Sequence, residues 1–374
     1  MSAVQLRHTL ISLACVLLGV GVLMVYSASI TARPSAADEI YLARHATFLG
    51  LSVICGMIAG LLPATFWRRA APWLFAATAL LLVLVVIPGL GHRVNGAQRW
   101  FRFGSMSLQP SEYAKLTIPL FVCWSLDKAR RASASRSVSA MRRGLWELRA
   151  VAPVAVVIGL VLVEPDLGTA AFLFGVATVS LFLMRWPAWC FLLAGLAAAP
   201  AIVGAAMLRP YQMQRIAGFI AGWRDFNAAP YQVQQSLTTL GAGGWNGVGL
   251  GHGWQKLSFL PEANTDFVFA VVGEELGLVG TLGLLGLWIA MYGCGMRLFA
   301  TVRTGEFESV AGRAILIQLV TQAAVNMAVV TALAPPKGIA HPLISYGGSS
   351  LLASVIALGM IVSLSRPVPD SSNS

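Results

Sequence analysis

Charged residues are scarce in this chain. They make up 11% of the 374 residues, whereas 57% are hydrophobic and the mean hydropathy is +0.74. One or two soluble domains with charged surfaces are therefore excluded. The composition instead predicts an integral membrane protein, in which the bilayer provides much of the apolar environment.

Cysteine and histidine are also scarce, with five of each. The cysteines stand singly in apolar stretches, so the sequence favours neither a disulfide framework nor a cysteine metal site. The histidines are dispersed, and no His-Glu-x-x-His pattern or nucleophile elbow occurs. The glycine-rich run 241–253 lacks the preceding strand and the following helix of a dinucleotide-binding fingerprint.

Long apolar runs are abundant. We count about ten that could cross a bilayer, at roughly 20 residues each. They lie near residues 8–30, 45–63, 70–90, 111–127, 148–164, 167–185, 188–207, 266–298, 311–333 and 344–365. The first run has no convincing cleavage site and is interpreted as a retained span. The expected fold is an all-α polytopic membrane protein with about ten transmembrane helices, and residues 1–374 form a single transmembrane domain.

Basic residues gather on alternate connections between these runs, which predicts that both termini are cytoplasmic. The Arg- and Ser-rich segment 127–149 is expected to be a basic cytoplasmic loop against anionic lipid headgroups, rather than a nucleic-acid site. The segment 208–265 is expected to be one large extracytoplasmic loop between helices seven and eight. Its two Tyr-Gln patches, which begin at Tyr211 and Tyr231, predict short helices at the membrane interface.

Asp266 stands where the loop 208–265 meets a long apolar run. A carboxylate near hydrocarbon is costly and indicates a functional site, although an N-terminal helix cap is the alternative. At helical spacing, Ala270, Gly273, Gly277 and Gly280 lie beneath Asp266 and form a smooth face for another helix.

Two further acids, Glu274 and Glu275, follow within the same run, with Glu275 on the opposite side of the predicted helix. An internal ion pair that locks helices together is the simpler interpretation of this pair. A role linked to a bound cation is the alternative.

A second set of candidates precedes the fourth run. Pro110 suits the first turn of a helix, and Glu112 and Lys115 are then spaced so that their side chains meet. Arg99 beside Trp100 suits a phosphate and a sugar, although an interfacial aromatic anchor has the same pattern. The Glu112–Lys115 pair is either a salt bridge at a helix end or part of a binding site.

Two outer turns complete the set. Lys337 and the glycines before the last run could bind an anion through a cation and free backbone amides, or could simply form a turn. Glu164 and Asp166 lie in a tight Glu-Pro-Asp turn, which is either structural or binds a cation or a hydroxyl group.

Six ordered motifs together resemble the SEDS family (shape, elongation, division and sporulation) of bacterial membrane glycosyltransferases. They are Met24–Ser29, Asn95–Trp100, Gln109–Glu112 with Lys115, Glu164–Gly168, Leu260–Gly277 and Ile344–Ser350. Several motifs are more similar to the division members than to the elongation members. Two departures occur: Asn264 stands where the family usually has His, and Ala340-His341 replaces the usual Pro-Leu.

The resemblance implies an enzyme that polymerises lipid II with inversion, releases undecaprenyl pyrophosphate, and acts at the outer face of the bacterial cytoplasmic membrane, enriched at the septum. It implies that Asp266 is the catalytic general base. The candidate substrate-binding residues are Arg99, Trp100, Gln109, Ser111, Glu112, Lys115, Arg215, Lys337, Ser345, Gly347 and Gly348. No cofactor is certain, although a divalent cation such as Mg²⁺ or Mn²⁺ could share the stabilisation of the leaving group.

The implied partners are lipid II, a class B penicillin-binding protein (a transpeptidase), other divisome membrane proteins and membrane lipids, with no nucleic acid. Two other functions are compatible with the residues alone: a flippase for the same lipid, and a noncatalytic division scaffold. The candidate charges cluster at the outer mouth rather than along the spans, which argues against a flippase.

Overall fold

The computed structural model describes residues 1–29, 36–94, 97–104, 106–134, 139–207, 210–254, 260–302 and 304–367. Parts of three expected features lie outside the described residues: 95–96 of the Asn95–Trp100 motif, 135–138 of the basic loop, and 208–209 and 255–259 of the large loop.

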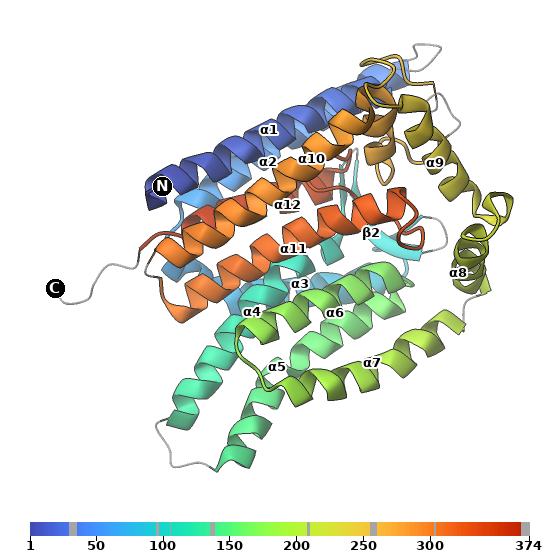
Figure 1. Cartoon of the computed structure of the whole chain (residues 1–374). Helices are drawn as coiled ribbons and strands as arrows, with labels where there is room; N and C mark the ends of the chain where they lie inside the picture. The colour runs from blue at the N-terminus through green and yellow to red at the C-terminus, as the bar shows by residue number, and fades with distance from the viewer. Residues whose placement is uncertain are drawn as a thin grey trace. The chain divides into compact units, whose positions relative to one another are not determined.

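Helices account for most of the described chain (Figure 1). The ten longest are α1 (Ala3–Ser29), α2 (Ala36–Leu61), α3 (Ala64–Val86), α4 (Pro110–Ala134), α5 (Ala140–Val163), α6 (Leu167–Leu183), α7 (Ala188–Met207), α10 (Val268–Thr301), α11 (Glu306–Val330) and α12 (Gly348–Leu364). Each overlaps one of the predicted apolar runs. Within the described residues, six helices are long and apolar enough to cross a membrane, namely α1, α2, α3, α5, α10 and α11, and the apolar helices α6 and α12 are shorter. The chain is therefore a helical, multi-pass membrane protein.

The prediction of an all-α fold was wrong for the segment between α3 and α4. This segment contains an antiparallel sheet of three strands, β1 (His92–Val94), β2 (Ala97–Phe103) and β3 (Met106–Leu108), in the order β1-β2-β3. Ala97 and Phe101, four residues apart on β2, are buried, whereas Arg102 is exposed. Side chains alternate between the two faces of a strand, so Ala97 and Phe101 share one face. The charges of this segment alone do not indicate a strand.

Between α7 and α10 the chain forms two short helices, α8 (Pro210–Gly222) and α9 (Tyr231–Gly243), with a short 3₁₀ turn at Phe226–Ala228 between them. The two Tyr-Gln patches lie at the starts of these helices, as predicted. Their position at the membrane interface stays a prediction. Asp225 caps the 3₁₀ turn by accepting a hydrogen bond from the N–H of Asn227 at 2.9 Å.

The chain divides into two compact units, whose boundaries fall within α2, α7, α10, α11 and α12. Unit 1 comprises residues 1–55, 206–297 and 319–355. In this unit α1 is tied to α10, because Ser27 donates hydrogen bonds to both carboxylate oxygens of Glu275 at 2.5 and 2.7 Å, and the Cys294 thiol donates to the carbonyl of Leu6 at 3.1 Å.

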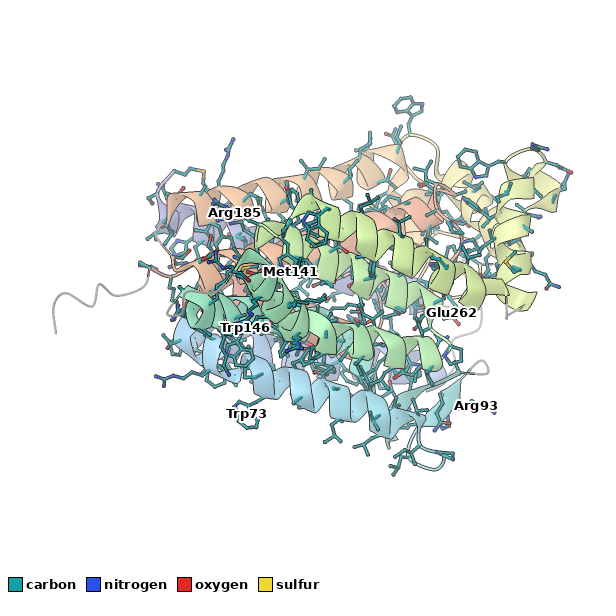
Figure 2. All side chains as sticks on the ribbon, turned by 90° about the horizontal axis from the view of Figure 1, so that it is seen from below. Trp73, Arg93, Met141, Trp146, Arg185 and Glu262 are labelled. Atoms are coloured by element: carbon teal, nitrogen blue, oxygen red, sulfur yellow. The ribbon has the colours of Figure 1, made fainter. Side chains whose placement is uncertain are left out.

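Unit 2 comprises residues 56–205, 298–318 and 356–374. Phe75 of α3 stacks on Phe121 of α4 with ring centroids 4.0 Å apart, and Trp67 donates to the hydroxyl of Ser363 at 3.1 Å. Figure 2 shows Arg93 at one end of this unit, and Met141 and Arg185 toward the other end. The connections that carry these residues therefore emerge at opposite ends of the helices, as expected for spans that alternate in direction.

Candidate functional site

Asp266 lies in the turn that leads into α10, two residues before the helix begins. The backbone N–H groups of Thr265 and Phe267 donate to the carbonyl of Glu262 at 3.1 and 3.2 Å, and this fixes the turn. The Asp266 side chain is partly buried. The acid therefore stands where an apolar helix starts, which is the position that the sequence analysis gave it.

The segment that follows α11, residues 331–347, is bonded to the Asp266 turn. The N–H of Tyr346 donates to the carbonyl of Asn264 at 2.8 Å, and the hydroxyl of Ser345 donates to the carbonyl of Thr265 at 2.5 Å. Two motifs that are far apart in the sequence thus form one structure within unit 1.

Gly338 lies directly against the Asp266 carboxylate. A Cβ atom added at Gly338 would be 2.9 Å from Oδ2 of Asp266, a distance that real Cβ atoms essentially never show. The carboxylate therefore packs on the backbone of the residue that follows Lys337. Within unit 1, the structure brings the candidate base Asp266 and the Lys337–Gly338 segment together.

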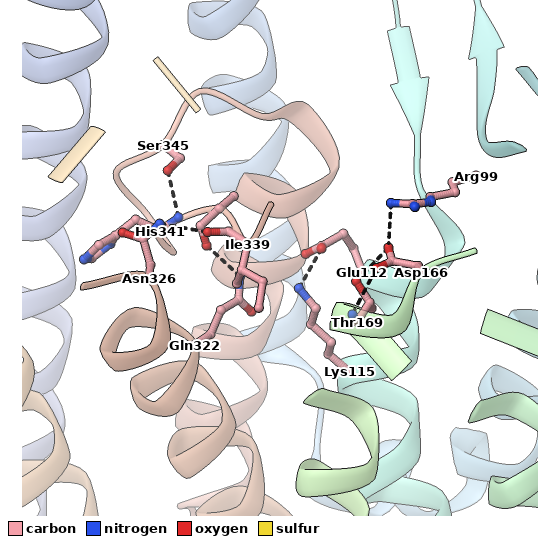
Figure 3. Close-up of polar contacts among 11 residues, drawn as sticks. Arg99, Glu112, Lys115, Asp166, Thr169, Gln322, Asn326, Ile339, His341 and Ser345 are labelled. Atoms are coloured by element: carbon pink, nitrogen blue, oxygen red, sulfur yellow. Dashed lines mark hydrogen bonds and ion pairs between the residues drawn. The ribbon is translucent and has the colours of Figure 1, made fainter. Parts of the chain in front are cut away.

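Two buried amides of α11 donate to the 331–347 segment (Figure 3), and one of them also donates to the Asp266 turn. Nδ2 of Asn326 donates to the carbonyl of Asp266 at 2.7 Å and to the carbonyl of Ile339 at 2.8 Å. Nε2 of Gln322 donates to the carbonyl of Ala340 at 3.0 Å. The sequence analysis missed both residues. Their signal was present, because polar residues four apart in an apolar helix share one face and indicate a functional or structural site.

His341, one of the departures from the family pattern, is fully buried in unit 1. Its ring stacks on Phe269 with centroids 6.4 Å apart and lies 5.7 Å from the ring of Trp288. Burial lowers the pKa of His341 to about 4, so its imidazole is neutral at ordinary pH. His341 therefore acts here as an aromatic packing residue.

Ser345 and Gly347 lie within the 331–347 segment, and Gly348 follows it directly. The Ser345 hydroxyl also accepts a hydrogen bond from the N–H of His341 at 2.7 Å. Gly348, the first residue of α12, packs against the ring of Phe48, where a side chain would collide. These contacts give Ser345 and Gly348 structural roles. Binding by Ser345, Gly347 and Gly348 stays a prediction.

Arg215 is held by the second Tyr-Gln patch. It lies on α8, and Nη2 donates to Oε1 of Gln232 on α9 at 2.9 Å. This bond links the two Tyr-Gln patches to each other.

Glu274 and Glu275 lie beside the glycine-rich run, and the continuous helical face drawn below Asp266 was wrong. Gly277 has φ 66° and ψ −163°, so α10 is interrupted there and the helical register does not continue to Gly280. Oε1 of Glu274 accepts from the N–H of Trp254 at 2.8 Å, while Glu275 is bound by Ser27. Both acids are buried and join segments of unit 1 together.

Arg99 of β2 clamps the Glu-Pro-Asp turn in unit 2 (Figure 3). Its guanidinium group donates to the carbonyl of Glu164 at 3.2 Å, to the carbonyl of Pro165 at 2.7 Å and to Oδ2 of Asp166 at 3.1 Å. Asp166 also caps α6, because it accepts hydrogen bonds from the N–H and the hydroxyl of Thr169 at 3.0 and 2.9 Å. Arg99 therefore fixes a turn in this structure.

Glu164 is buried in that turn with 2% of its surface exposed. Neither carboxylate oxygen has a hydrogen-bond partner among the described residues. Burial, followed by repulsion from Asp166, raises the pKa of Glu164 to about 8, against the opposing attraction of Arg99. Glu164 and Asp166 therefore have different surroundings, although only one residue separates them.

Glu112 and Lys115 meet as their spacing predicted. Nζ of Lys115 lies 2.6 Å from Oε1 of Glu112, and both side chains are nearly buried in α4, which begins at Pro110 as expected. Nζ also lies 5.6 Å from the ring centroid of Phe172, a cation–π distance.

The neighbouring candidates differ in their exposure. Ser111 is fully buried, and Trp100 is partly buried on β2, where it pairs with His92. The carbonyl of Gln109 accepts from the N–H of Glu112 at 3.2 Å at the start of α4.

An apolar cavity of about 750 Å³ opens between α9, α10 and α11 in unit 1. Its lining includes Gly273 and Gly277 on α10, Met327 on α11 and Leu240 on α9.

Across the described ranges, no cluster of three or more His, Cys, Asp or Glu side chains could hold a metal ion.

The chain matches known proteins along nearly its whole length. It is 37% identical over 347 residues to the "Probable peptidoglycan glycosyltransferase FtsW" of Trichlorobacter lovleyi, covering 92% of this chain and 89% of that protein. It is 36% identical over 353 residues to the protein of the same name from Coxiella burnetii, covering 92% of each.

Solved structures agree with these relatives. A chain from a structure described as "Structural coordination of polymerization and crosslinking by a peptidoglycan synthase complex" superposes with a TM-score of 0.73 at 29% identity, covering 96% of both chains. The rod shape determining protein RodA of Thermus thermophilus superposes with a TM-score of 0.66 at 27% identity, covering 96% of this chain and 95% of RodA.

The model of the FtsW/RodA/SpoVE family, described as cell cycle protein, matches residues 7–368. The resemblance to SEDS proteins that the six motifs suggested is confirmed. The chain therefore belongs to the FtsW/RodA/SpoVE family of cell cycle proteins.

Proposed function

We propose that this protein is a peptidoglycan glycosyltransferase that polymerises lipid II into glycan strands during septal cell-wall synthesis. The observation that carries the proposal is the packing of the Asp266 carboxylate on Gly338, beside Lys337, at the start of an apolar helix. The names of the FtsW relatives support the reaction class, and their identity over more than nine-tenths of this chain supports a division role over an elongation role.

The proposed reaction needs a base and charge stabilisation. The Asp266 carboxylate takes the proton of an acceptor sugar hydroxyl while the hydroxyl oxygen attacks the anomeric carbon of the donor. The bond between that carbon and the pyrophosphate oxygen breaks, and undecaprenyl pyrophosphate leaves with the electron pair. Attack from the face opposite the leaving group inverts the anomeric carbon.

Cations would stabilise the negative charge that develops on the departing pyrophosphate. Lys337 is the first candidate, because its segment packs against Asp266. For Arg99 and Lys115 we propose substrate binding through the turn and the helix end that they organise in unit 2. Trp100, Gln109, Ser111, Glu112, Arg215, Ser345, Gly347 and Gly348 stay secondary binding candidates. A divalent cation is not required by this scheme.

We further propose the orientation and setting that the sequence indicated. Both termini are cytoplasmic, the chain crosses the bacterial cytoplasmic membrane about ten times, and the loop 208–265 lies outside near the septum. The partner is a class B penicillin-binding protein that crosslinks the strands. Support comes from the solved relative described as part of a peptidoglycan synthase complex.

The test is polymerisation of labelled lipid II by the purified protein together with its transpeptidase partner. We expect Asp266→Asn to lower the rate at least about 100-fold, because general bases contribute that much or more. Asp225→Asn is the matched control, because Asp225 is exposed and Asn also caps a turn. The control should polymerise lipid II at the wild-type rate.

Three outcomes separate the alternatives. Wild-type polymer synthesis by Asp266→Asn would rule out the general-base role. Absence of polymer under all conditions, with transfer of lipid II across proteoliposome bilayers, would support a flippase instead. Absence of both activities, with the partner still bound, would support a scaffold.

A further inference from the structure

The amide group of Asn326 joins two segments that meet at the proposed base. Asn326 is 1% exposed and lies on α11, near its C-terminal end. Its Nδ2 atom carries two hydrogens, and both are used, on the carbonyl of Asp266 at 2.7 Å and on the carbonyl of Ile339 at 2.8 Å. One side chain therefore ties Asp266 itself and the residue that follows Lys337-Gly338 to a single helix.

The chemistry of these two bonds fixes the orientation of the amide. Both partners are carbonyl oxygens, which only accept hydrogen bonds, so the NH₂ group must face them. A rotated amide would place its own oxygen against two other oxygens. A carboxylate at this position would do the same, because ionised Asp has no donor.

We infer that Asn326 is a positioning residue for the polymerisation reaction, which sets the Asp266 carboxylate relative to the Lys337–Gly338 segment. This inference rests on the proposed role of Asp266 as the base. Asn326 acts through the backbone of Asp266 and does not take the proton itself. Reacting groups lose about 100-fold in rate when they are misplaced by about 1 Å, so loss of this link should affect turnover more than binding.

The neighbouring amide provides a matched comparison. Gln322 lies one turn earlier on the same helix, is equally buried, and donates a bond of similar length, 3.0 Å, to the carbonyl of Ala340. Loss of the bond from Gln322 to Ala340 also removes a buried link to the Gly338–Tyr346 segment, but leaves the bond to Asp266 in place.

The experiment compares Asn326→Asp, Asn326→Ser and Gln322→Ala in the complex with the transpeptidase partner. We expect both Asn326 variants to lower kcat for lipid II roughly 10- to 100-fold, with KM changed less than about threefold. Ser has one hydroxyl donor, so it should retain more activity than Asp. Gln322→Ala should show a comparable drop in thermal stability with a much smaller loss of kcat.

The pH profile of kcat/KM gives a second measurement, because a change in the surroundings of the base should move its acid limb in Asn326→Ser and not in Gln322→Ala. Wild-type kcat in a folded Asn326 variant would overturn the inference. The inference would also be overturned if kcat fell in proportion to the melting temperature in all three variants. The same holds if neither Asn326 variant accumulated in the membrane, because either result indicates a structural role. If Asp266→Asn were itself active, the proposed function would fail first.

Discussion

Glu164 and Asp166 are separated by one residue and yet have opposite surroundings. Asp166 accepts hydrogen bonds from Arg99 and Thr169, whereas Glu164 is buried without a hydrogen-bond partner among the described residues. Burial disfavours the charged form of an acid, which is why the pKa of Glu164 rises to about 8. The Glu164 side chain is thus mostly protonated at neutral pH.

This difference predicts a pH dependence of stability. Below about pH 4.5 the Glu164 carboxyl is protonated in both the folded and the unfolded chain, so it imposes no charge burial. As pH rises from about 4.5 to 8, the unfolded chain loses the proton first, so the free energy of unfolding falls. Glu164→Gln should remove this decline, as thermal unfolding in nanodiscs between pH 5 and 9 would measure.

The matched variant for this measurement is Asp225→Asn, which alters an exposed carboxylate. Its melting temperature should follow the wild-type curve across the whole pH range. A wild-type decline in Glu164→Gln would mean that Glu164 is ionised in the folded protein, contrary to its burial.

At the scale of elements, the backbone of α10 around its interruption is hydrogen-bonded to the glycine-rich run 241–253. The N–H groups of Leu278 and Val279 donate to the carbonyls of Gly244 and Trp245 at 2.9 and 3.2 Å. In return, the N–H groups of Val248 and Gly249 donate to the carbonyls of Glu274 and Glu275 at 2.9 and 3.1 Å. The backbone groups that the break exposes are therefore paired with the loop, as a membrane segment requires.

Gly277→Ala should destabilise the protein by about 1–3 kcal/mol, because its φ and ψ lie in a region that is essentially limited to glycine. An added Cβ would also collide with the backbone of Gly247 and Trp245. Gly283→Ala on the same helix is the control, since a Cβ there meets nothing within 4 Å. Thermal unfolding would compare the two, and equal melting temperatures would contradict the described break.

The sequence could predict the features that depend only on residues close together in the chain. The apolar runs marked the long helices, Pro110 marked the start of α4, and the spacing of Glu112 and Lys115 marked their contact. It could not predict the break at Gly277, because that conformation depends on a partner loop some 30 residues away. The link from Asn326 to Asp266 spans 60 residues and was beyond local pattern analysis for the same reason.

At the scale of the whole molecule, the transpeptidase partner that we propose needs a surface on this chain. The apolar cavity between α9, α10 and α11 has an exposed rim on α10, where Leu278, Leu282 and Leu285 are 41%, 55% and 40% exposed. We expect the membrane helix of the proposed partner, a class B penicillin-binding protein, to pack there.

A photo-crosslinking amino acid at Leu282 should therefore form an adduct with the partner's membrane helix when both proteins are produced together. The same group at Val156, on α5, is the control, because this side chain is 63% exposed in a helix that does not line the cavity. Van der Waals packing drives association between membrane helices, so the reactive group must lie in direct contact with the partner to be captured. Mass spectrometry of the adducts identifies the captured segment. Capture at Val156 alone would place the partner on α5 and leave the cavity to another ligand, whereas capture at Leu282 alone supports the packing of the partner against α10.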